Sequence, residues 1–327
     1  MTIKEVARQA GVSPAAVSRY LNGGPVSEEK ARKIRAVMEE TGFQPNAMAR
    51  SMRTGQRNQI GIITPRIDSE SAAEILEGVT EFLHGSGYGT LLEVSGDRGA
   101  CEVQCIESLL YQQAAGIILM GTVLRPELRV LLEENKKPIV VTGQRFEGFT
   151  CVYHSDYEAV RELARRMLQK GRRAIGYLGV FEDDEAMGKA RRLGAEAAWK
   201  EAGSTSSLPA ALSEGFRPED GRRAMKTLME KVPAMDGVIC ASDQLAVGAM
   251  LAIRDAGRQI PGDIAVAGVG DSWVNDATAP PLTSVRLFYR QCGREAARLL
   301  MERVKSAEPL PPEQIRLGYE IIERESV

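Results

Sequence analysis

The sequence predicts an α/β protein with a small helical head and a larger, two-lobed body built from parallel sheets. The first 42 of the 327 residues contain short helical stretches separated by glycines, whereas from residue 59 onward short apolar runs alternate with helical stretches. Charge divides at nearly the same point, because residues 1–57 hold 10 of the 42 Lys and Arg but only 5 of the 44 Asp and Glu. A basic head on an acidic body indicates a polyanionic partner for the head.

Capping residues mark the first two helices of the head. Thr2 and Glu5 form a Ser/Thr-x-x-Glu capping box, and Gly11 ends the first helix. Ser13 is predicted to cap the second helix, and Pro14 takes its first position, where a missing N–H costs nothing.

The third helix is predicted to begin after Ser27 and to turn Ile34 and Met38 toward its partners. An Asn-Gly-Gly sequence at residues 22–24 separates it from the second helix. Three short helices with a tight glycine turn between the first two form the helix-turn-helix pattern. We therefore assign residues 1–44 to a helix-turn-helix domain.

A basic segment that begins with a proline joins the head to the body over residues 45–58. Asn46 is a candidate helix cap, and Met48 and Met52 are four residues apart, so they share one helical face. This spacing predicts a short hinge helix followed by a linker.

The body is predicted to contain two parallel sheets. Near-continuous Val, Ile and Leu runs with helices between them are typical of buried strands in right-handed βαβ units. The runs are QIGIITP, GTLLEVS, AGIILMGT, KPIVVTG, RAIGYLGV, MDGVICAS and DIAVAGVG. We expect residues 59–155 and 286–308 to form the first lobe and residues 156–285 and 309–327 the second. The segments SVRLFYRQCGREAARLL and EQIRLGYEIIERE, the latter strand-like, are expected to cross between them.

Composition argues against several other classes of protein. No apolar run reaches ~18 residues and no basic-then-apolar leader is seen, so we expect neither membrane insertion nor secretion. Five Cys are too few for a disulfide scaffold, and together with 12 Met they favour a reducing cytoplasm.

The sequence offers few groups for catalysis or metal binding. Cys101 and Cys105 lie one helical turn apart, but no His or second Cys pair follows at ligand spacing. There are only two His, and the acidic residues 183–185 have the pattern of an exposed turn. We therefore expect no enzymatic activity, no cofactor and no bound metal.

The head and hinge follow a known family pattern almost residue by residue. The match is carried by TIKEVARQAGVSPAAVSRYLNG and VSEEKARKIRAVMEETGFQPNAMARSMRTGQRNQIGII, and it continues into the body with CASDQLAVGAM, IPGDIAVAGVGDS and PPLTSVRL. In these motifs the chain resembles the LacI/GalR family of bacterial transcription repressors. The resemblance implies a homodimeric, cytoplasmic, nucleoid-associated repressor that binds double-stranded operator DNA. It also implies a periplasmic-binding-protein-like body that binds a small sugar effector.

The resemblance assigns DNA contacts to the second helix of the head. Small residues at its start allow it to lie deep in the major groove, where Arg19 would reach base edges, with guanine favoured. Pro14 and Ala15 offer only apolar contacts, as to a thymine methyl, and Ser13, Ser18 and Asn22 suit phosphates. The alternative is that Arg19 is an ordinary surface arginine. The expected contacts in the head are Thr2, Ser13, Pro14, Ala15, Ala16, Ser18, Arg19 and Asn22.

In the family pattern, the hinge helix enters the minor groove. The resemblance places Met52 at the position of an apolar wedge that kinks the duplex. Relatives usually have Leu there, and Met is a softer wedge. The alternative is that Met48 and Met52 pack in a core. The expected hinge contacts are Asn46, Ala49, Arg50, Met52 and Arg53.

The effector site is implied to lie in the cleft between the lobes. An R-x-x-G pattern places the effector-binding arginine at Arg191, with Arg192 as the neighbouring alternative. Phe216 either stacks on a sugar face or packs in the core, and Asp243 either binds a hydroxyl or caps a helix. The expected effector contacts are Arg66, Arg191, Phe216, Ser242, Asp243 and Asp271.

Two departures limit what the family implies for this cleft. Ser242 replaces a usual Asn, and Gly270 replaces a frequent Asp, so the usual hexose contacts do not carry over. The stretches GQRFEGFTCVYHSDYEAV, YLGVFEDDEAMGKARRLGAEAAW and ICASDQLAVGA are similar to the trehalose- and sucrose-responsive repressors of the family. In the trehalose type, an arginine after the first strand of the body binds a sugar phosphate. Arg66 matches that position, and Arg191 would be its partner. We therefore expect a disaccharide or disaccharide phosphate as the effector.

The alternative function is that of a two-lobed sugar-binding protein without a DNA function. Such a protein would have no use for residues 1–57.

Overall fold

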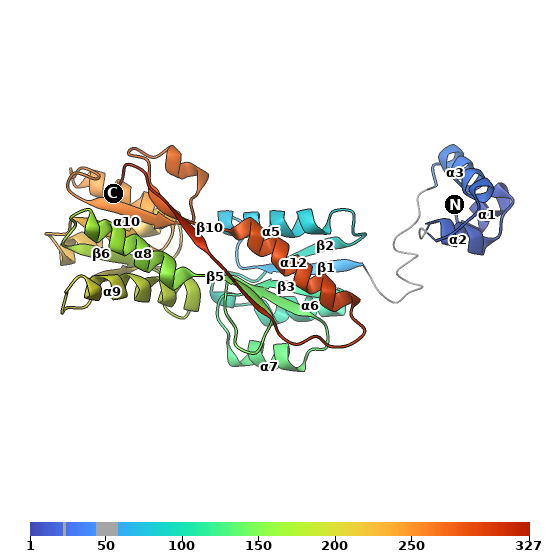
Figure 1. Cartoon of the computed structure of the whole chain (residues 1–327), viewed down its shortest axis with the longest axis horizontal. Coiled ribbons are helices and arrows are strands. Elements are labelled where there is room, and N and C mark those ends of the chain that lie inside the picture. Colours follow the sequence, from blue (N-terminus) through green and yellow to red (C-terminus); the bar gives the residue numbers. More distant parts are fainter. Residues whose placement is uncertain (22–23, 44–57) are drawn as a thin grey trace. The chain divides into compact units, whose positions relative to one another are not determined.

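The structure is a computed structural model of the chain, and it describes residues 1–21, 24–43 and 58–327. The chain divides into two compact units, Met1–Arg57 and Asn58–Val327 (Figure 1). Each unit is described by itself below. None of the helices in the described ranges is both long enough and apolar enough to cross a membrane.

The described part of the head contains three helices, as predicted: α1 (Ile3–Ala10), α2 (Pro14–Leu21) and α3 (Glu28–Thr41). Val6, Val17 and Ile34 form the centre of their shared core and are fully buried. The capping box at Thr2 is present, and Gly11 ends α1 with a φ of 63°, a left-handed conformation that glycine adopts without steric cost.

Ser13 and Ser27 differ in how they begin their helices. The Ser13 hydroxyl accepts a hydrogen bond from the Ala16 N–H at 3.2 Å, as a cap does. Ser27 occupies the cap position of α3, but its side chain makes no capping hydrogen bond. The predicted start of α3 is therefore right and the predicted cap is wrong, while Glu28 and Glu29 place negative charge in the first turn.

The first lobe of the body is a six-stranded parallel sheet in the order β11-β5-β4-β3-β1-β2. Its strands are β1 (Gln59–Thr64), β2 (Gly89–Val94), β3 (Gly116–Met120), β4 (Ile139–Thr142), β5 (Cys151–His154) and β11 (Gln314–Leu317). One face packs against α5 (Glu70–Leu83) and α12 (Tyr289–Lys305), the other against α6 (Glu102–Tyr111) and α7 (Pro126–Glu134). Because both faces are covered, most of its strands read as continuous apolar runs.

The second lobe is a six-stranded sheet in the order β12-β10-β9-β8-β6-β7. Its strands are β6 (Ile175–Gly179), β7 (Ala210–Leu212), β8 (Gly237–Cys240), β9 (Ala265–Val269), β10 (Thr283–Leu287) and β12 (Tyr319–Ile322). Only β12 runs antiparallel to its neighbour. Its helices are α8 (Asp156–Gln169), α9 (Arg191–Glu201), α10 (Pro218–Lys231) and α11 (Asp243–Asp255).

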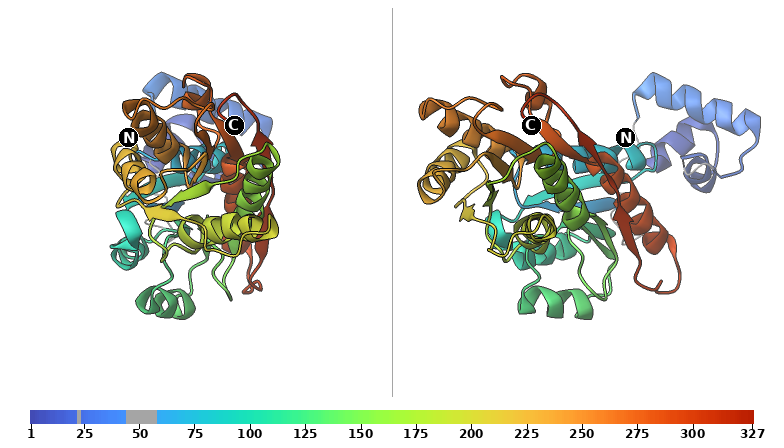
Figure 2. Two further views of the ribbon diagram at one scale, coloured as in Figure 1. Left: turned by 90° about the vertical axis from the view of Figure 1, so that its left-hand side faces the viewer. Right: turned by 60° about the vertical axis from the view of Figure 1, so that its left-hand side comes forward.

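The chain crosses between the lobes after β5, after β10 and after β11 (Figures 1 and 2). The last crossing confirms that the segment EQIRLGYEIIERE passes between the lobes: it is divided at Gly318 into β11 and β12, one in each sheet. The predicted boundary is wrong in one respect: residues 309–327 were assigned to the second lobe, but β11 belongs to the first, where Leu317 pairs with His154. The apolar pattern shows that a strand exists but not which sheet receives it.

Candidate ligand cleft and helix-turn-helix surface

A cavity of about 180 Å³ lies between the two lobes of the body. It is bordered by segments at the carboxyl ends of β1, β2, β3 and β4 in the first lobe and of β6, β7, β8 and β9 in the second. Open parallel sheets bind their ligands at this end of the strands. Its polar and aromatic lining includes Arg66, Glu70, Glu74, Arg98, Thr122, Gln144, His154, Asp156, Phe181, Asp184, Arg191, Phe216, Ser242, Asp243 and Tyr289.

Arg191 lines the cavity, but its guanidinium is already paired. Its Nε lies 2.7 Å from a carboxylate oxygen of Asp156, and a terminal N–H donates to the Ala241 carbonyl at 2.5 Å. Burial is the largest single influence and lowers the pKa of Arg191, but the charge of Asp156, the hydrogen bond to it and the nearby Tyr289 together outweigh burial and hold that pKa above its ordinary value. Because the side chain is only 4% exposed, removing either partner would leave a buried charge unpaired, at a cost of about 3–5 kcal/mol. Arg191 thus braces the start of α9 against the start of α8.

Two phenylalanines of the second lobe lie beside two arginines of the first. Phe181 and Phe216 meet edge to face, with ring centroids 5.7 Å apart. The guanidinium carbon of Arg66 is 5.3 Å from the centroid of Phe216, and that of Arg98 is 4.4 Å from the centroid of Phe181. These are cation–π distances. Arg98 lies in none of the stretches that resemble the family, and Phe181 lies in one but was not singled out there, so their place in the cleft was not predicted.

Arg66 and Arg191, which were expected to bind one phosphate together, each already contact other groups of the protein. Arg66 forms an ion pair with Asp68 at 2.7 Å, besides its contact with Phe216. Arg191 is directed at Asp156 and the Ala241 carbonyl. A phosphate between the two arginines would have to compete with those partners.

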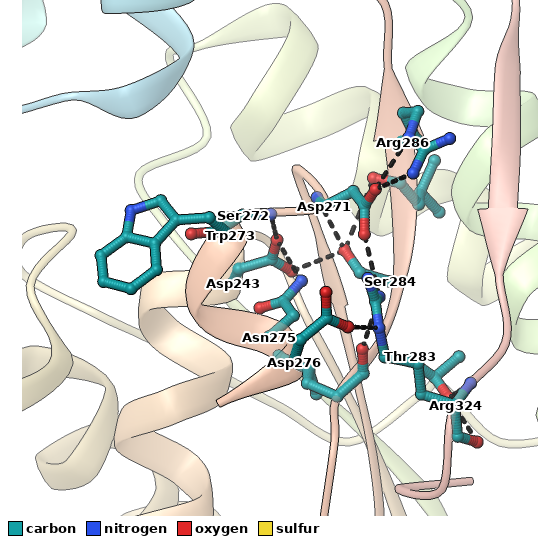
Figure 3. A network of polar contacts seen from close by, with 12 residues as sticks. Asp243, Asp271, Ser272, Trp273, Asn275, Asp276, Thr283, Ser284, Arg286 and Arg324 are labelled. Atoms are coloured by element: carbon teal, nitrogen blue, oxygen red, sulfur yellow. Dashed lines mark hydrogen bonds and ion pairs between the residues drawn. The ribbon is translucent and has the colours of Figure 1, made fainter. Parts of the chain in front are cut away.

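Ser242 and Asp243 lie at the start of α11, and the alternative that Asp243 caps this helix is wrong. Ser242 is the cap, because its hydroxyl accepts from the Leu245 N–H at 3.4 Å. The buried carboxylate of Asp243 accepts from the Ser284 hydroxyl at 2.6 Å, the Ser272 N–H at 2.8 Å and the Asn275 amide at 2.9 Å (Figure 3). Burial raises its pKa, and these hydrogen bonds oppose the rise. Asp243 therefore holds the loop after β9 in place at the cavity wall.

Asp271 does not line the cavity, although it was predicted to contact the effector. Its carboxylate forms ion pairs with Arg286 at 2.7 Å and with Arg324 at 2.9 Å (Figure 3). The backbone explains this placement, since Asp271 follows Gly270 at a positive φ of 55° and its side chain lies on the β10 side of the loop. The neighbouring Gly270 and Ser272 line the cavity instead.

Asp184 lies inside the cavity, which corrects the prediction of an exposed acidic turn at residues 183–185. Its side chain accepts from the Met187 N–H at 2.8 Å and begins the helical turn Glu185–Ala190 that leads into α9. The same carboxylate oxygen accepts from the Gln144 amide at 2.8 Å. Burial raises the pKa of Asp184, opposed by these two hydrogen bonds. Three consecutive acidic residues gave no signal that the middle one is a buried cap.

His154 and Tyr289 lie at two of the crossings and form the floor of the cavity. Their ring centroids are 5.1 Å apart, with the rings edge to face. Burial lowers the pKa of His154 and raises the pKa of Tyr289 to about 12, so both are uncharged near neutral pH. Within the described ranges, no group of three or more His, Cys, Asp or Glu is placed to hold a metal ion.

In the head, α2 presents most of its predicted DNA contacts to solvent. Pro14, Ala15 and Arg19 are exposed, as are Ser13 and Thr2, while Ser18 is half-buried. Ala16 is an exception, because only 3% of it is exposed and it packs toward the interior with Val17. Ala16 is therefore misplaced in the predicted set, since residues on the inner face of an eight-residue helix cannot also reach a groove.

Six of the predicted DNA contacts lie outside the described residues. They are Asn22, Asn46, Ala49, Arg50, Met52 and Arg53.

Comparisons with known proteins agree with this division into head and body. A model described as "Bacterial regulatory proteins, lacI family" matches residues 2–46, and a "Periplasmic binding protein-like domain" matches residues 164–327. The HTH-type transcriptional regulator RegA of Clostridium saccharobutylicum is 30% identical over 328 residues, covering 99% of this chain and 98% of the relative.

Two further similar proteins have names that mention a sugar. The sucrose operon repressor of Staphylococcus xylosus is 26% identical over 303 residues, which is 93% of each protein. A solved structure described as the transcriptional regulator CelR–cellobiose complex is similar with a TM-score of 0.75 and 28% identity, over the full length of both chains.

Proposed function

The chain belongs to the lacI family of bacterial regulatory proteins and is a DNA-binding transcriptional regulator, and from this premise we propose that a small sugar in the cleft controls its affinity for operator DNA. We take it to be a repressor that acts as a homodimer in the cytoplasm, associated with the nucleoid, and without enzymatic activity. Two heads would read a pseudo-palindromic operator, because a two-fold dimer presents two equivalent α2 helices.

The observation that carries the sugar proposal is the make-up of the cleft. Phe181 and Phe216 supply apolar surface, and Gln144, Asp184 and Asp243 supply hydrogen-bonding groups around the same cavity. A sugar has apolar C–H faces and hydroxyl edges, so it needs both kinds of surface at once.

The charges around the cavity support an uncharged sugar over a sugar phosphate. Five carboxylates line it against three guanidiniums, and each guanidinium already has a partner. The carboxylates belong to Glu70, Glu74, Asp156, Asp184 and Asp243, and the guanidiniums to Arg66, Arg98 and Arg191. The names of the relatives agree, since sucrose and cellobiose are neutral disaccharides. We therefore propose a neutral disaccharide as the effector.

The proposed control works through the equilibrium between arrangements of the two lobes. An effector that contacts both lobes favours one arrangement and shifts the equilibrium by its difference in affinity for the two. The shift would reach the operator through residues 45–58, weakening the hold of the heads. A coupling free energy of about 1–3 kcal/mol is typical of such linkage.

Thermal unfolding with a panel of sugars tests this proposal. We expect a neutral disaccharide among sucrose, cellobiose, trehalose and maltose to stabilise the protein, by about 2.7 kcal/mol at 100 times its Kd. Trehalose 6-phosphate and sucrose 6-phosphate should not.

The variant Phe216→Ala should lose most of this stabilisation, because it removes the apolar platform. Tyr111→Ala is the matched control, since Tyr111 is an exposed aromatic residue outside the cavity. If only the sugar phosphates stabilise the protein, the effector is not an uncharged sugar. If a sugar stabilises Phe216→Ala as much as the wild type, the sugar does not bind beside Phe216.

A further inference from the structure

A buried hydrogen-bonded pair joins the two lobes across the cleft. The Gln144 side chain, on the loop after β4 of the first lobe, donates from its amide to Asp184 at 2.8 Å and accepts from the Ala186 N–H at 3.2 Å. Asp184 and Ala186 both belong to the segment that joins β6 to α9 in the second lobe. The side chains of Gln144 and Asp184 are nearly inaccessible to solvent. The amide therefore uses its donor and its acceptor on the opposite lobe at once.

Two other polar contacts across the cleft lie in solvent. The Trp273 N–H donates to Glu70 at 3.2 Å, next to an indole that is 77% exposed, and Arg217 lies 3.8 Å from Asp68 with both side chains more than half exposed. Exposed contacts of this kind compete with water and are screened by salt. The pair formed by Gln144 and Asp184 is shielded from both.

This pair is also attached to the segment that carries Arg191. Asp184 begins the helical turn Glu185–Ala190, and Arg191 follows as the first residue of α9. Arg191 in turn holds Asp156 at the crossing after β5. A change in the contact between Gln144 and Asp184 therefore acts on the same short segment that braces the crossing.

We propose that Gln144 and Asp184 form a latch that keeps the lobes in contact across the cleft before any effector binds. Opening the cleft would separate an amide and a carboxylate that satisfy one another in a dry site. An effector hydroxyl, which both donates and accepts, can replace either partner without leaving the other unsatisfied. The inference rests on the proposed function for its consequence on DNA binding, whereas the separation of the lobes is measurable without DNA or sugar.

The test is a spin-label distance measurement on the full-length protein. Labels are placed on cysteines substituted for the exposed Lys136 of the first lobe and Lys200 of the second, in a Cys101→Ser background because Cys101 is exposed. Labelled protein is diluted with an excess of unlabelled protein, so that only distances within one protomer are recorded.

Three variants test the latch: one removes its donor, one keeps its acceptor, and the double variant exchanges donor and acceptor. Gln144→Glu removes the donor and faces Asp184 with a second carboxylate, so we expect a longer and broader distance distribution. Asp184→Asn keeps an acceptor for Gln144 and for the Met187 N–H, so the wild-type distance should remain. In the double variant Gln144→Glu/Asp184→Asn the new amide donates to the new carboxylate, and the wild-type distance should return.

Controls separate the latch from charge and from misfolding. Arg145→Gln makes the same change in net charge one position along the chain, on an exposed side chain, and should leave the distance unchanged. Gln144→Met removes donor and acceptor without adding charge, and should also lengthen the distance, which keeps the test valid if Gln144→Glu does not fold. A wild-type distance in Gln144→Met, or a double variant as open as Gln144→Glu, would overturn the latch.

Discussion

Arg19 is the exposed side chain on α2 from which base readout is expected, because its neighbours Pro14 and Ala15 have no hydrogen-bonding side chains. A bidentate arginine–guanine contact discriminates by about 1–3 kcal/mol against the wrong base. Phosphate contacts, by contrast, strengthen binding to every sequence alike. The two roles therefore predict different results for the same substitution.

For Arg19→Ala we expect the preference for a duplex selected from random DNA over a scrambled duplex to shrink by that 1–3 kcal/mol. Fluorescence anisotropy at fixed salt measures both affinities. Arg32→Ala, which removes an exposed arginine of α3, is the control and should leave the preference unchanged. If Arg19→Ala weakens both duplexes equally, Arg19 contacts phosphate and is not the reader.

At the residue scale, the sequence indicated several positions around the cleft correctly but not what their side chains do there. Arg191 lines the cavity as expected, yet its guanidinium is engaged by Asp156, 35 positions earlier in the chain. Asp184 looked exposed because acidic runs usually are, and its burial depends on Gln144 of the other lobe. Such partners are distant in sequence, and a single sequence carries no record of which distant residues meet.

At the scale of elements, the close packing of α5 against α12 sets where the second crossing enters the cleft. A Cβ atom added at Gly293 of α12 would lie 1.9 Å from the Ile75 carbonyl of α5, and one added at Gly78 would lie 2.0 Å from the Arg290 carbonyl. Both approaches are shorter than any real carbon–oxygen contact, so each helix needs a glycine there. Tyr289, at the start of α12, is thereby held at the floor of the cavity.

Gly293→Ala should therefore lower the free energy of unfolding by about 1–3 kcal/mol, because the added methyl forces the two helices apart. Urea denaturation followed by circular dichroism measures the loss. Gly89→Ala is the matched control, since a Cβ at that position meets no atom within 4 Å. If both variants unfold at the same urea concentration, α5 and α12 can move apart at no cost, and the prediction is wrong.

The strands were predictable where burial on both faces produced continuous apolar runs, as in β3 and β9. The edge strand β7 escaped prediction because it is only three residues long, Ala210–Leu212. The break at Gly318 escaped for a different reason, since the residues on both sides of it have strand-like patterns. Local pattern therefore identified most of the strands, and only tertiary pairing decided their sheets.

At the scale of the whole molecule, the basic head and the acidic body are separate compact units with separate chemistry. The family pattern in residues 2–46 indicated the function of the first unit, and the alternating runs indicated the fold of the second. Neither indicates how strongly the units are coupled, because coupling is a difference between two states of the protein. The central claim, that a sugar in the cleft controls the hold on DNA, therefore requires a measurement on both units together.

That measurement is the affinity of the full-length protein for a selected duplex at fixed salt, with and without 10 mM of each of sucrose, cellobiose, trehalose and maltose. We expect one of these sugars to raise the Kd for DNA by about 5–150-fold, which corresponds to a coupling free energy of about 1–3 kcal/mol. The same sugar should stabilise the protein against heat, and Phe216→Ala should lose both effects. A Kd for DNA that stays constant while a sugar clearly stabilises the protein would contradict the account.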